Sequence, residues 1–167
     1  RLCDIPVSVP TKHLFPSVAD WAKVLQATKK LTIRGNMTND ILDKAWSIFE
    51  ELDTSKANEM LLHGDLHQDN ILHDEKRGWI AIDPKGVIGD HAFNAARFII
   101  NNWSKIPSRD LVDTRVEMIA KAMGHSESRI AGWAYVDYVI SNCWSLEEND
   151  ESKIDVSFAK KLESLYM

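Results

Sequence analysis

The side chains best able to do chemistry are concentrated between positions 63 and 90. The segments HGDLHQDNIL (63–72) and IDPKGVIGD (82–90) bring carboxylates, an amide and imidazoles close together in the chain. Phosphoryl transfer requires a carboxylate beside the acceptor hydroxyl and oxygen ligands for magnesium, because hard divalent cations prefer carboxylate and amide oxygens. Asp65, Asn70 and Asp83 can supply these three roles.

Short strands are expected to position these three residues. Between positions 59 and 83 the apolar runs MLL, NIL and WIAI are separated by polar turns, which is typical of short strands around a loop. We expect Asp65 to lie in that loop and to accept the proton of a substrate hydroxyl. Asn70 is expected to begin a strand and Asp83 to end the strand WIAID, so that both face one metal ion.

Lys85 and His67 are candidates for phosphate contacts. Lys85 follows Asp83 by two positions, and His67 follows Asp65 by two positions. A structural or merely exposed role is the alternative for both side chains.

Three acidic residues near the C-terminal end are candidates for substrate contacts. Asp137 lies in a segment that is apolar on nearly every side, where an unpaired carboxylate is costly, so it should either pair with a core arginine or face the acceptor cleft. Glu147 and Glu148 belong to a short acidic run, for which a solvated helix end is the simpler interpretation.

Two linked motifs carry a resemblance to a known family. The spacing HxDxxxxN, followed by an Asp at a strand end, resembles the catalytic loop and metal-binding Asp of protein kinases. In its HGD form the motif is similar to that of the aminoglycoside phosphotransferases. LLHGDLHQDNIL together with WIAIDPKGVIGD resembles the streptomycin 6-phosphotransferase branch, which is grouped with the aminoglycoside and hydroxyurea resistance kinases.

The resemblance implies a bilobal, protein-kinase-like fold that uses ATP and Mg²⁺. The smaller lobe of that fold supplies a lysine and most of the adenine pocket, and the helical lobe supplies the acid, the metal ligands and the acceptor site. No glycine-rich hairpin and no VAIK-like lysine precede Asp65. We therefore expect one domain, residues 1–167, that is the α+β, mostly helical C-terminal lobe with a small β hairpin carrying the catalytic loop. Without the N-terminal lobe the isolated chain should bind ATP weakly and turn over slowly.

The resemblance also assigns supporting roles to individual residues. His63 matches the motif histidine, which braces the loop backbone, and His67 stands where protein kinases carry a lysine. Asp90 resembles the carboxylate that starts the following helix and steadies the catalytic loop, although a helix N-cap is the simpler interpretation. Family members often have an acidic residue four positions later, where this sequence has Asn94.

The remaining sequence predicts helices on both sides of this segment. Ser17 with Asp20 resembles a capping box, and Thr38 or Asn39 can cap a second helix. Apolar periodicity, caps and glycines predict helices at 18–34, 39–52, from 91 onward, 109–123, 127–147 and 153–166.

Composition limits the functional classes. The formal net charge of −5 argues against nucleic acid as a partner and is mildly favourable for a cationic ligand. No apolar run is long enough to span a membrane. Cys3 and Cys143 form no CxxC pair, which indicates neither a zinc site nor a disulfide framework. We expect a soluble, cytoplasmic protein.

The leading hypothesis is a kinase that transfers the γ-phosphoryl group of ATP to a hydroxyl of a cationic aminoglycoside such as streptomycin. A metabolic small-molecule kinase of the same fold has the same motif and is an alternative. A metallohydrolase using His63, Asp65, His67 and Asp83 is a weaker one, because it leaves Asn70 unexplained. A non-catalytic relic or binding module is a further alternative, favoured by the missing lobe.

Overall fold

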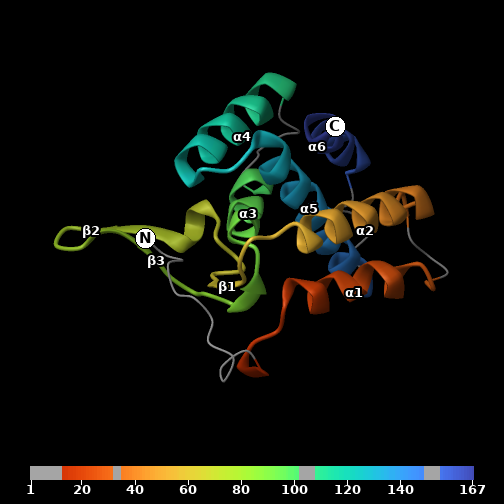
Figure 1. The fold of residues 1–167 in the computed structure, drawn as a ribbon, viewed down its shortest axis with the longest axis horizontal. Helices are drawn as coiled ribbons and strands as arrows, with labels where there is room; N and C mark the ends of the chain where they lie inside the picture. The colour runs from red at the N-terminus through yellow and green to blue at the C-terminus, as the bar shows by residue number, and fades with distance from the viewer. Residues whose placement is uncertain (1–12, 32–34, 102–107, 149–154) are drawn as a thin grey trace.

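A single helix, α5, lies at the centre of the molecule. The computed structural model describes residues 13–31, 35–101, 108–148 and 155–167. The α-helices of these residues are α1 (Val18–Thr28), α2 (Asn39–Thr54), α3 (Asn94–Ile100), α4 (Arg109–Met123), α5 (Glu127–Glu147) and α6 (Val156–Tyr166). Helix α5 contacts each of the other five helices, which lie around it in Figure 1.

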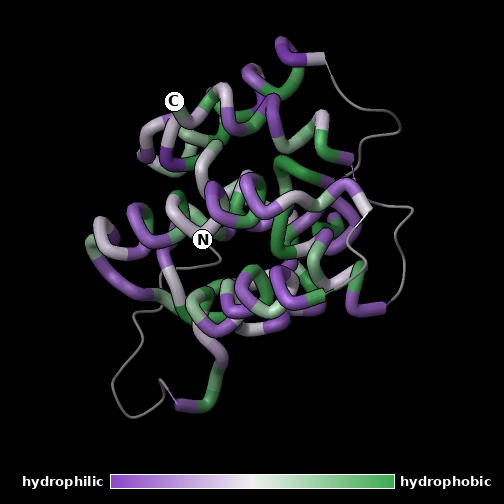
Figure 2. Tube along the Cα trace, turned by 90° about the vertical axis from the view of Figure 1, so that its right-hand side faces the viewer, coloured by the Kyte–Doolittle hydropathy of each residue, from purple (hydrophilic) through white to green (hydrophobic). Residues whose placement is uncertain are grey.

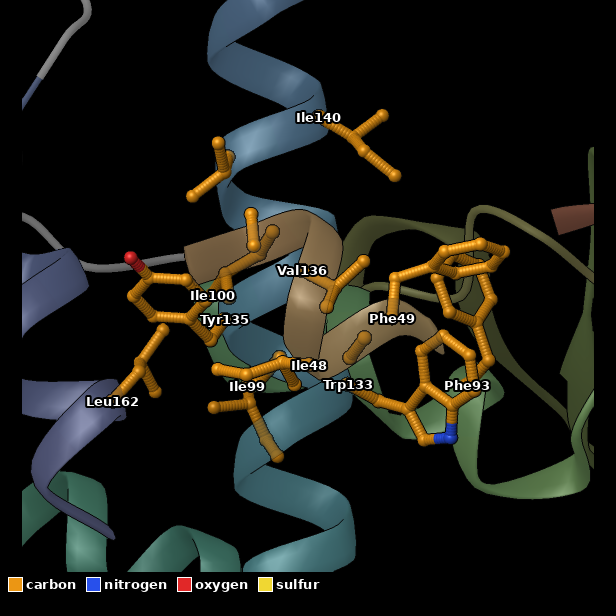
Figure 3. Close-up of a cluster of buried hydrophobic side chains, with 14 of the residues drawn as sticks. Ile48, Phe49, Phe93, Ile99, Ile100, Trp133, Tyr135, Val136, Ile140 and Leu162 are labelled. Atoms are coloured by element: carbon orange, nitrogen blue, oxygen red, sulfur yellow. The ribbon is translucent and has the colours of Figure 1, made fainter. Parts of the chain in front are cut away.

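The burial of α5 follows from its sequence. Thirteen of its residues are buried, and they point in every direction around the helix axis rather than along one stripe. Figure 3 shows side chains of α5, among them Trp133, Tyr135 and Val136, surrounded by apolar side chains from other segments. The neighbours labelled there come from α2 (Ile48, Phe49), the turn before α3 (Phe93), α3 (Ile99, Ile100) and α6 (Leu162).

The outer helices are amphipathic and are capped by side chains. In Figure 2, hydrophobic and hydrophilic residues alternate along them, as expected for helices with one face on a core. Ser17 and Asp20 form the predicted capping box at the start of α1, and Thr38 caps α2. Ser108 and Ser126 cap α4 and α5 in the same way, so local sequence sets where these helices begin.

Four short strands lie between α2 and α3 and form two antiparallel pairs. Strand β1 (Met60–Leu62) pairs with β4 (Val87–Gly89), and β2 (Ile71–Asp74) forms a hairpin with β3 (Gly78–Ala81). The segment 63–70, which carries the HGD motif, connects the two pairs and ends in the 3₁₀ turn η2 (Gln68–Asn70). Figure 1 shows the β2–β3 hairpin projecting from the helical body.

Several element boundaries differ from the expectations. Helix α1 ends at Thr28 rather than at position 34, through i→i+3 hydrogen bonds from Lys30 and Leu31. The β-branched residues Thr32 and Ile33, which disfavour a helix, follow directly in the sequence.

The positions predicted for Asn70 and Asp83 relative to the strands are wrong by one or two residues. Strand β3 ends at Ala81, so Asp83 lies two residues beyond it, and Asn70 ends the turn η2 rather than beginning β2. The helix predicted from position 91 begins with a 3₁₀ turn, η3 (His91–Phe93), before α3. The predicted helices 109–123 and 127–147 are confirmed, and α6 begins at Val156, while positions 153 and 154 lie outside the described residues.

Among the described residues, no helix is long and apolar enough to cross a membrane. Cys143 is a buried free thiol, and Cys3 lies outside the described residues.

A close helix contact makes Gly132 sensitive to substitution. A Cβ atom at Gly132 of α5 would lie 2.6 Å from a ring carbon of Tyr166 and 2.9 Å from Leu52. We expect Gly132→Ala to lower the free energy of unfolding by about 1 to 3 kcal/mol, because overpacking outweighs the higher helix propensity of alanine. Urea unfolding followed by circular dichroism measures this, with Ser128→Ala on the exposed side of the same helix as the control. An unchanged or raised stability of Gly132→Ala would contradict the packing described.

Candidate active site

The loop that carries Asp65 is held against the turn after β3 by backbone hydrogen bonds. The carbonyl oxygen of His63 accepts from the N–H groups of Lys85 (2.8 Å) and Gly86 (3.2 Å). Gly64 adopts a φ of +79°, a left-handed conformation that glycine takes without steric cost. The segments HGD and IDPKG, which are separate in the sequence, therefore lie side by side.

The imidazole of His63 links the same two segments. Its Nδ1 accepts from the backbone N–H of Asp65 (3.3 Å), and its Nε2 lies 2.8 Å from the carbonyl oxygen of Ile82. With Nδ1 as the acceptor, Nε2 is the ring nitrogen that donates to Ile82. These bonds support the bracing role expected for His63 and occupy both ring nitrogens.

Asn94 anchors the beginning of the loop. Its Oδ1 accepts from the backbone N–H of His63 at 3.0 Å, and the side chain is buried at the start of α3. An amide oxygen thus makes a contact that a carboxylate oxygen could also make, and it does so without adding a charge.

Asp90 serves as a helix cap and binds α5. Its Oδ1 accepts from the N–H of Ala92 (3.0 Å), which confirms the N-cap interpretation. Its Oδ2 accepts from Trp133 Nε1 (2.8 Å) and from the guanidinium of Arg129. Arg129 also donates to the carbonyl oxygen of Leu52 in α2 (3.0 Å), so Asp90 joins the end of β4 to two helices.

Asn70 and Asp83 lie at the base of the β2–β3 hairpin. The backbone oxygen of Asn70 accepts from the N–H of Ile82 (2.9 Å), which brings Asn70 opposite the residue before Asp83. The Asn70 amide nitrogen donates to the carbonyl oxygen of Asp65 (2.9 Å), so the amide oxygen is the end of the side chain left for a ligand. Asp83 has a φ of +53°, which turns the chain out of the hairpin just before Pro84.

Lys85 forms an ion pair with Asp83. The distance from Lys85 Nζ to Asp83 Oδ2 is 3.0 Å, and both side chains are more than half exposed. The hydrogen bond and charge of Asp83 raise the pKa of Lys85 above its ordinary value, and the charge of Asp65 adds to this effect. Lys85 therefore stays charged beside two of the predicted site residues.

Asp65 lies in a cleft of about 490 Å³ between the loop and the helices. The cleft is lined by Pro16, Trp21, Gly64, Asp65, Lys85, Arg97 and Trp144. Small-molecule sites in proteins commonly have volumes of about 300 to 1,000 Å³, so this cleft can hold a compact ligand.

Arg97 of α3 connects Asp65 to the buried Asp137 of α5. Its Nε lies 3.6 Å from Asp65 Oδ1, and its Nη2 donates to Asp137 Oδ1 at 2.9 Å. The hydroxyl of Ser141 accepts from Nη1 at 2.8 Å. Asp137 is 1% exposed, so the prediction that it pairs with a core arginine is confirmed and direct contact with an acceptor is not supported.

The other predicted residues lie around the cleft or beyond it. His67 lies between two carboxylates, with its Nε2 3.9 Å from Asp65 Oδ2 and its Nδ1 3.7 Å from Asp69 Oδ2. Glu147 and Glu148 are exposed at the C-terminal end of α5, one turn beyond the Trp144 that lines the cleft.

The hypothesis of a metallohydrolase finds no support in the described residues. Within them, no three His, Cys, Asp or Glu side chains are grouped in a way that could hold a metal ion. His63 in particular has both ring nitrogens engaged with the backbone. A magnesium site differs from such a cluster, because Mg²⁺ prefers oxygen ligands and these can include the amide oxygen of Asn70.

Sequence reasoning missed Arg97, Trp21 and Trp144 as residues of the cleft. The sequence did contain a signal for Arg97. It is the single arginine in the apolar segment after Asp90, and Asp137 is the single carboxylate in another apolar segment. Two lone charges of opposite sign in apolar helices predict an ion pair. The tryptophans carry no such signal, since apolar periodicity assigns them equally well to the core.

Comparisons with known proteins give the class to which this chain belongs. The profile of the aminoglycoside/hydroxyurea antibiotic resistance kinases matches residues 4–149, and the chain belongs to this family. It is 29% identical over 97 residues to streptomycin 6-kinase of Streptomyces griseus, covering 56% of this chain and 32% of that protein. It is 30% identical over 155 residues to streptomycin 3''-kinase of Klebsiella pneumoniae, covering 86% of this chain and 55% of that protein.

The chain thus spans between about a third and just over half of these curated relatives. A crystal structure of an aminoglycoside phosphotransferase in ternary complex with ADP and hygromycin B aligns with 87% of this chain and 51% of that chain, at 12% identity and a TM-score of 0.49.

The buried Asp137 predicts a specific pH dependence of stability. The pKa of the Asp137 carboxyl is raised to about 6, and burial is the main cause. The negative charge of Asp65 adds to the rise, and the positive charge of Arg97 opposes it. Because the folded protein holds this proton more tightly than the unfolded chain, the associated stabilisation is present below about pH 4 and is lost as the pH rises through 6. In Asp137→Asn this titration is absent.

We therefore expect the stability of the original protein relative to Asp137→Asn to fall by about 2 to 3 kcal/mol between pH 4 and pH 7. Urea unfolding of both proteins across this range measures the difference. A difference that does not vary with pH would contradict the assignment to Asp137.

Proposed function

We propose that this chain is the catalytic lobe of an ATP-dependent kinase that phosphorylates a hydroxyl group of an aminoglycoside such as streptomycin. The observation that carries the proposal is the junction of the loop and the hairpin, where hydrogen bonds of Asn70 join the backbone of Asp65 to that of Ile82, the residue before Asp83. The names of the relatives support the acceptor class, since two of them are streptomycin kinases.

Asp65 is the proposed catalytic base. Its carboxylate lines the cleft, where it can accept the proton of an acceptor hydroxyl. The hydroxyl oxygen then forms a bond to the γ-phosphorus, and the bond from this phosphorus to the β–γ bridging oxygen breaks. The guanidinium of Arg97, with its Nε 3.6 Å from Asp65 Oδ1, helps to hold this carboxylate in place.

Asn70 and Asp83 are the proposed magnesium ligands. Their amide and carboxylate oxygens are of the type that Mg²⁺ prefers, and the exposure of Asp83 leaves room for phosphate oxygens and water. A bound Mg²⁺ supplies charge that stabilises the transferring phosphoryl group. Asp83 would then exchange its ion pair with Lys85 for the metal, which leaves Lys85 available to a phosphate.

Exposed apolar side chains in and beside the hairpin favour the presence of a second lobe that covers them. Leu72 and Ile82 are 50% and 40% exposed, and they flank the two proposed metal ligands in the sequence. Such side chains are suited to cover a nucleotide base or to pack against another lobe. We propose that an N-terminal, nucleotide-covering lobe completes the site, and that the 167-residue chain alone turns over slowly.

Replacing the proposed base tests the reaction. In the protein expressed from the whole reading frame, we expect Asp65→Asn to lower phosphorylation of streptomycin by about 100-fold or more, because the proton acceptor is lost. The assay follows ADP release with streptomycin, other aminoglycosides, hydroxyurea and simple alcohols. Asp69→Asn is the matched control, since Asp69 lies in the same loop with its side chain 75% exposed, and it should change the rate by less than about 3-fold.

The outcomes of this assay separate the alternatives. Turnover that persists in Asp65→Asn would rule out the assigned base. Turnover of simple alcohols alone would identify a metabolic kinase, and the absence of turnover with every acceptor would favour a relic.

Replacing a proposed metal ligand tests the magnesium site. We expect Asp83→Asn to raise the Mg²⁺ concentration needed for half-maximal rate by about 10-fold or more, because a neutral amide binds the cation more weakly than a carboxylate. Initial rates over a series of Mg²⁺ concentrations measure this, with Asp74→Asn, at the far end of the hairpin, as the control. An unchanged Mg²⁺ requirement would place the metal elsewhere.

A further inference from the structure

Two tryptophans from different helices form one side of the cleft that contains Asp65. Trp21 of α1 and Trp144 of α5 meet edge to face, with ring centroids 5.4 Å apart and an interplanar angle of 81°. Both side chains are partly buried, so part of each ring is accessible. Partly accessible indoles beside a polar cleft are the features of a ligand site rather than of a sealed core.

Trp21 is held in place by the catalytic loop itself. A Cβ atom at Gly64 would lie 2.9 Å from Cη2 of Trp21, so the indole packs directly on the backbone next to Asp65. The ring of Phe93 lies 6.1 Å from that of Trp21 on another side and fixes its orientation. A molecule that places a hydroxyl at Asp65 must therefore lie close to this indole.

The charges around the cleft determine where cationic groups of an acceptor can lie. Both cations that line the cleft already have acidic partners, since Lys85 pairs with Asp83 and Arg97 pairs with Asp137 and faces Asp65. Because the carboxylates on the Lys85 and Arg97 side are already paired with these two cations, that side offers a cationic substituent little further attraction, whereas an indole face attracts it through the ring quadrupole. The tryptophan side of the cleft is the favourable side for such a group.

We propose that Trp21 and Trp144 form the acceptor subsite, a wall against which the ring of a polyhydroxylated, cationic acceptor lies while its hydroxyl reaches Asp65. This inference rests on the proposed function and specifies the residues that select its substrate. Apolar ring faces pack on the indoles, and cationic substituents lie over their faces. Glu147 and Glu148 follow Trp144 by one helical turn and are exposed, and they do not line the cleft itself.

The test measures binding without nucleotide, so that it does not depend on turnover. Streptomycin is titrated into the protein expressed from the whole reading frame, and tryptophan fluorescence and calorimetry report the affinity. We expect Trp144→Leu to weaken binding by about 10-fold and to reduce the fluorescence change, and Trp144→Phe to weaken it by about 2- to 3-fold. Trp79→Leu is the control, because Trp79 is 74% exposed on the hairpin and does not line the cleft; its affinity should change by less than 2-fold.

Each outcome decides the proposal. Binding of streptomycin that is weakened in Trp144→Leu but not in Trp79→Leu supports the subsite. If that result is found and no acceptor is phosphorylated, the subsite stands and only the proposed function fails. Normal affinity and KM for streptomycin in Trp144→Leu, with phosphorylation intact, overturns the subsite alone. A lowered unfolding midpoint in Trp144→Leu with unchanged affinity also overturns it, because the ring would then serve only packing. Failure of the original protein to bind streptomycin overturns the proposal as well.

Discussion

Helix α5 can be stable only if every side of it is covered by other parts of the protein. A helix that is apolar on every side must be surrounded, and here five other helices contact it. Its few buried polar groups must then find partners inside the protein, because an unpaired polar group away from water is costly. Asp137 is paired with Arg97, and Trp133 donates to Asp90. Asp90 ends the segment that carries the candidate site and Arg97 lines its cleft, so the core and the site share these contacts.

The candidate site is assembled from backbone contacts more than from side chains. The carbonyl oxygen of His63 accepts two bonds from the turn at Lys85 and Gly86, and the His63 ring adds two further links. The two strand pairs are only three or four residues long and could not hold a loop by themselves. The chain therefore uses a buried histidine and the amide of Asn94 to fix the loop against the helices, and Asp65 projects from this fixed backbone into the cleft.

The electrostatic arrangement is a chain of alternating charges from the core to the surface. It runs from Asp137 through Arg97 to Asp65, and beyond Asp65 lie Lys85 and Asp83. Each charge lies close to one of opposite sign, so the buried and partly buried charges of this series have partners inside the protein. Such an arrangement suits the roles proposed for Asp65 as the base and for Asp83 as a metal ligand that exchanges its partner Lys85 for the ion. The tryptophan wall lies outside this chain of charges and leaves an uncharged surface for an acceptor ring.

The linear order of residues was enough to predict the helix starts that side chains cap, the linked HGD and IDPKG motifs, and the family. These depend on local hydrogen bonds and on spacing, which the linear order of residues contains: Ser17, Thr38 and Ser126 cap the predicted helices. The sequence predicted that Asp137 pairs with an arginine but did not identify Arg97, since contacts across 40 positions depend on how helices pack. Only the folded arrangement brings Trp21 and Trp144 into one cleft with Asp65, because apolar periodicity shows that a side chain faces inward but not which neighbours it meets.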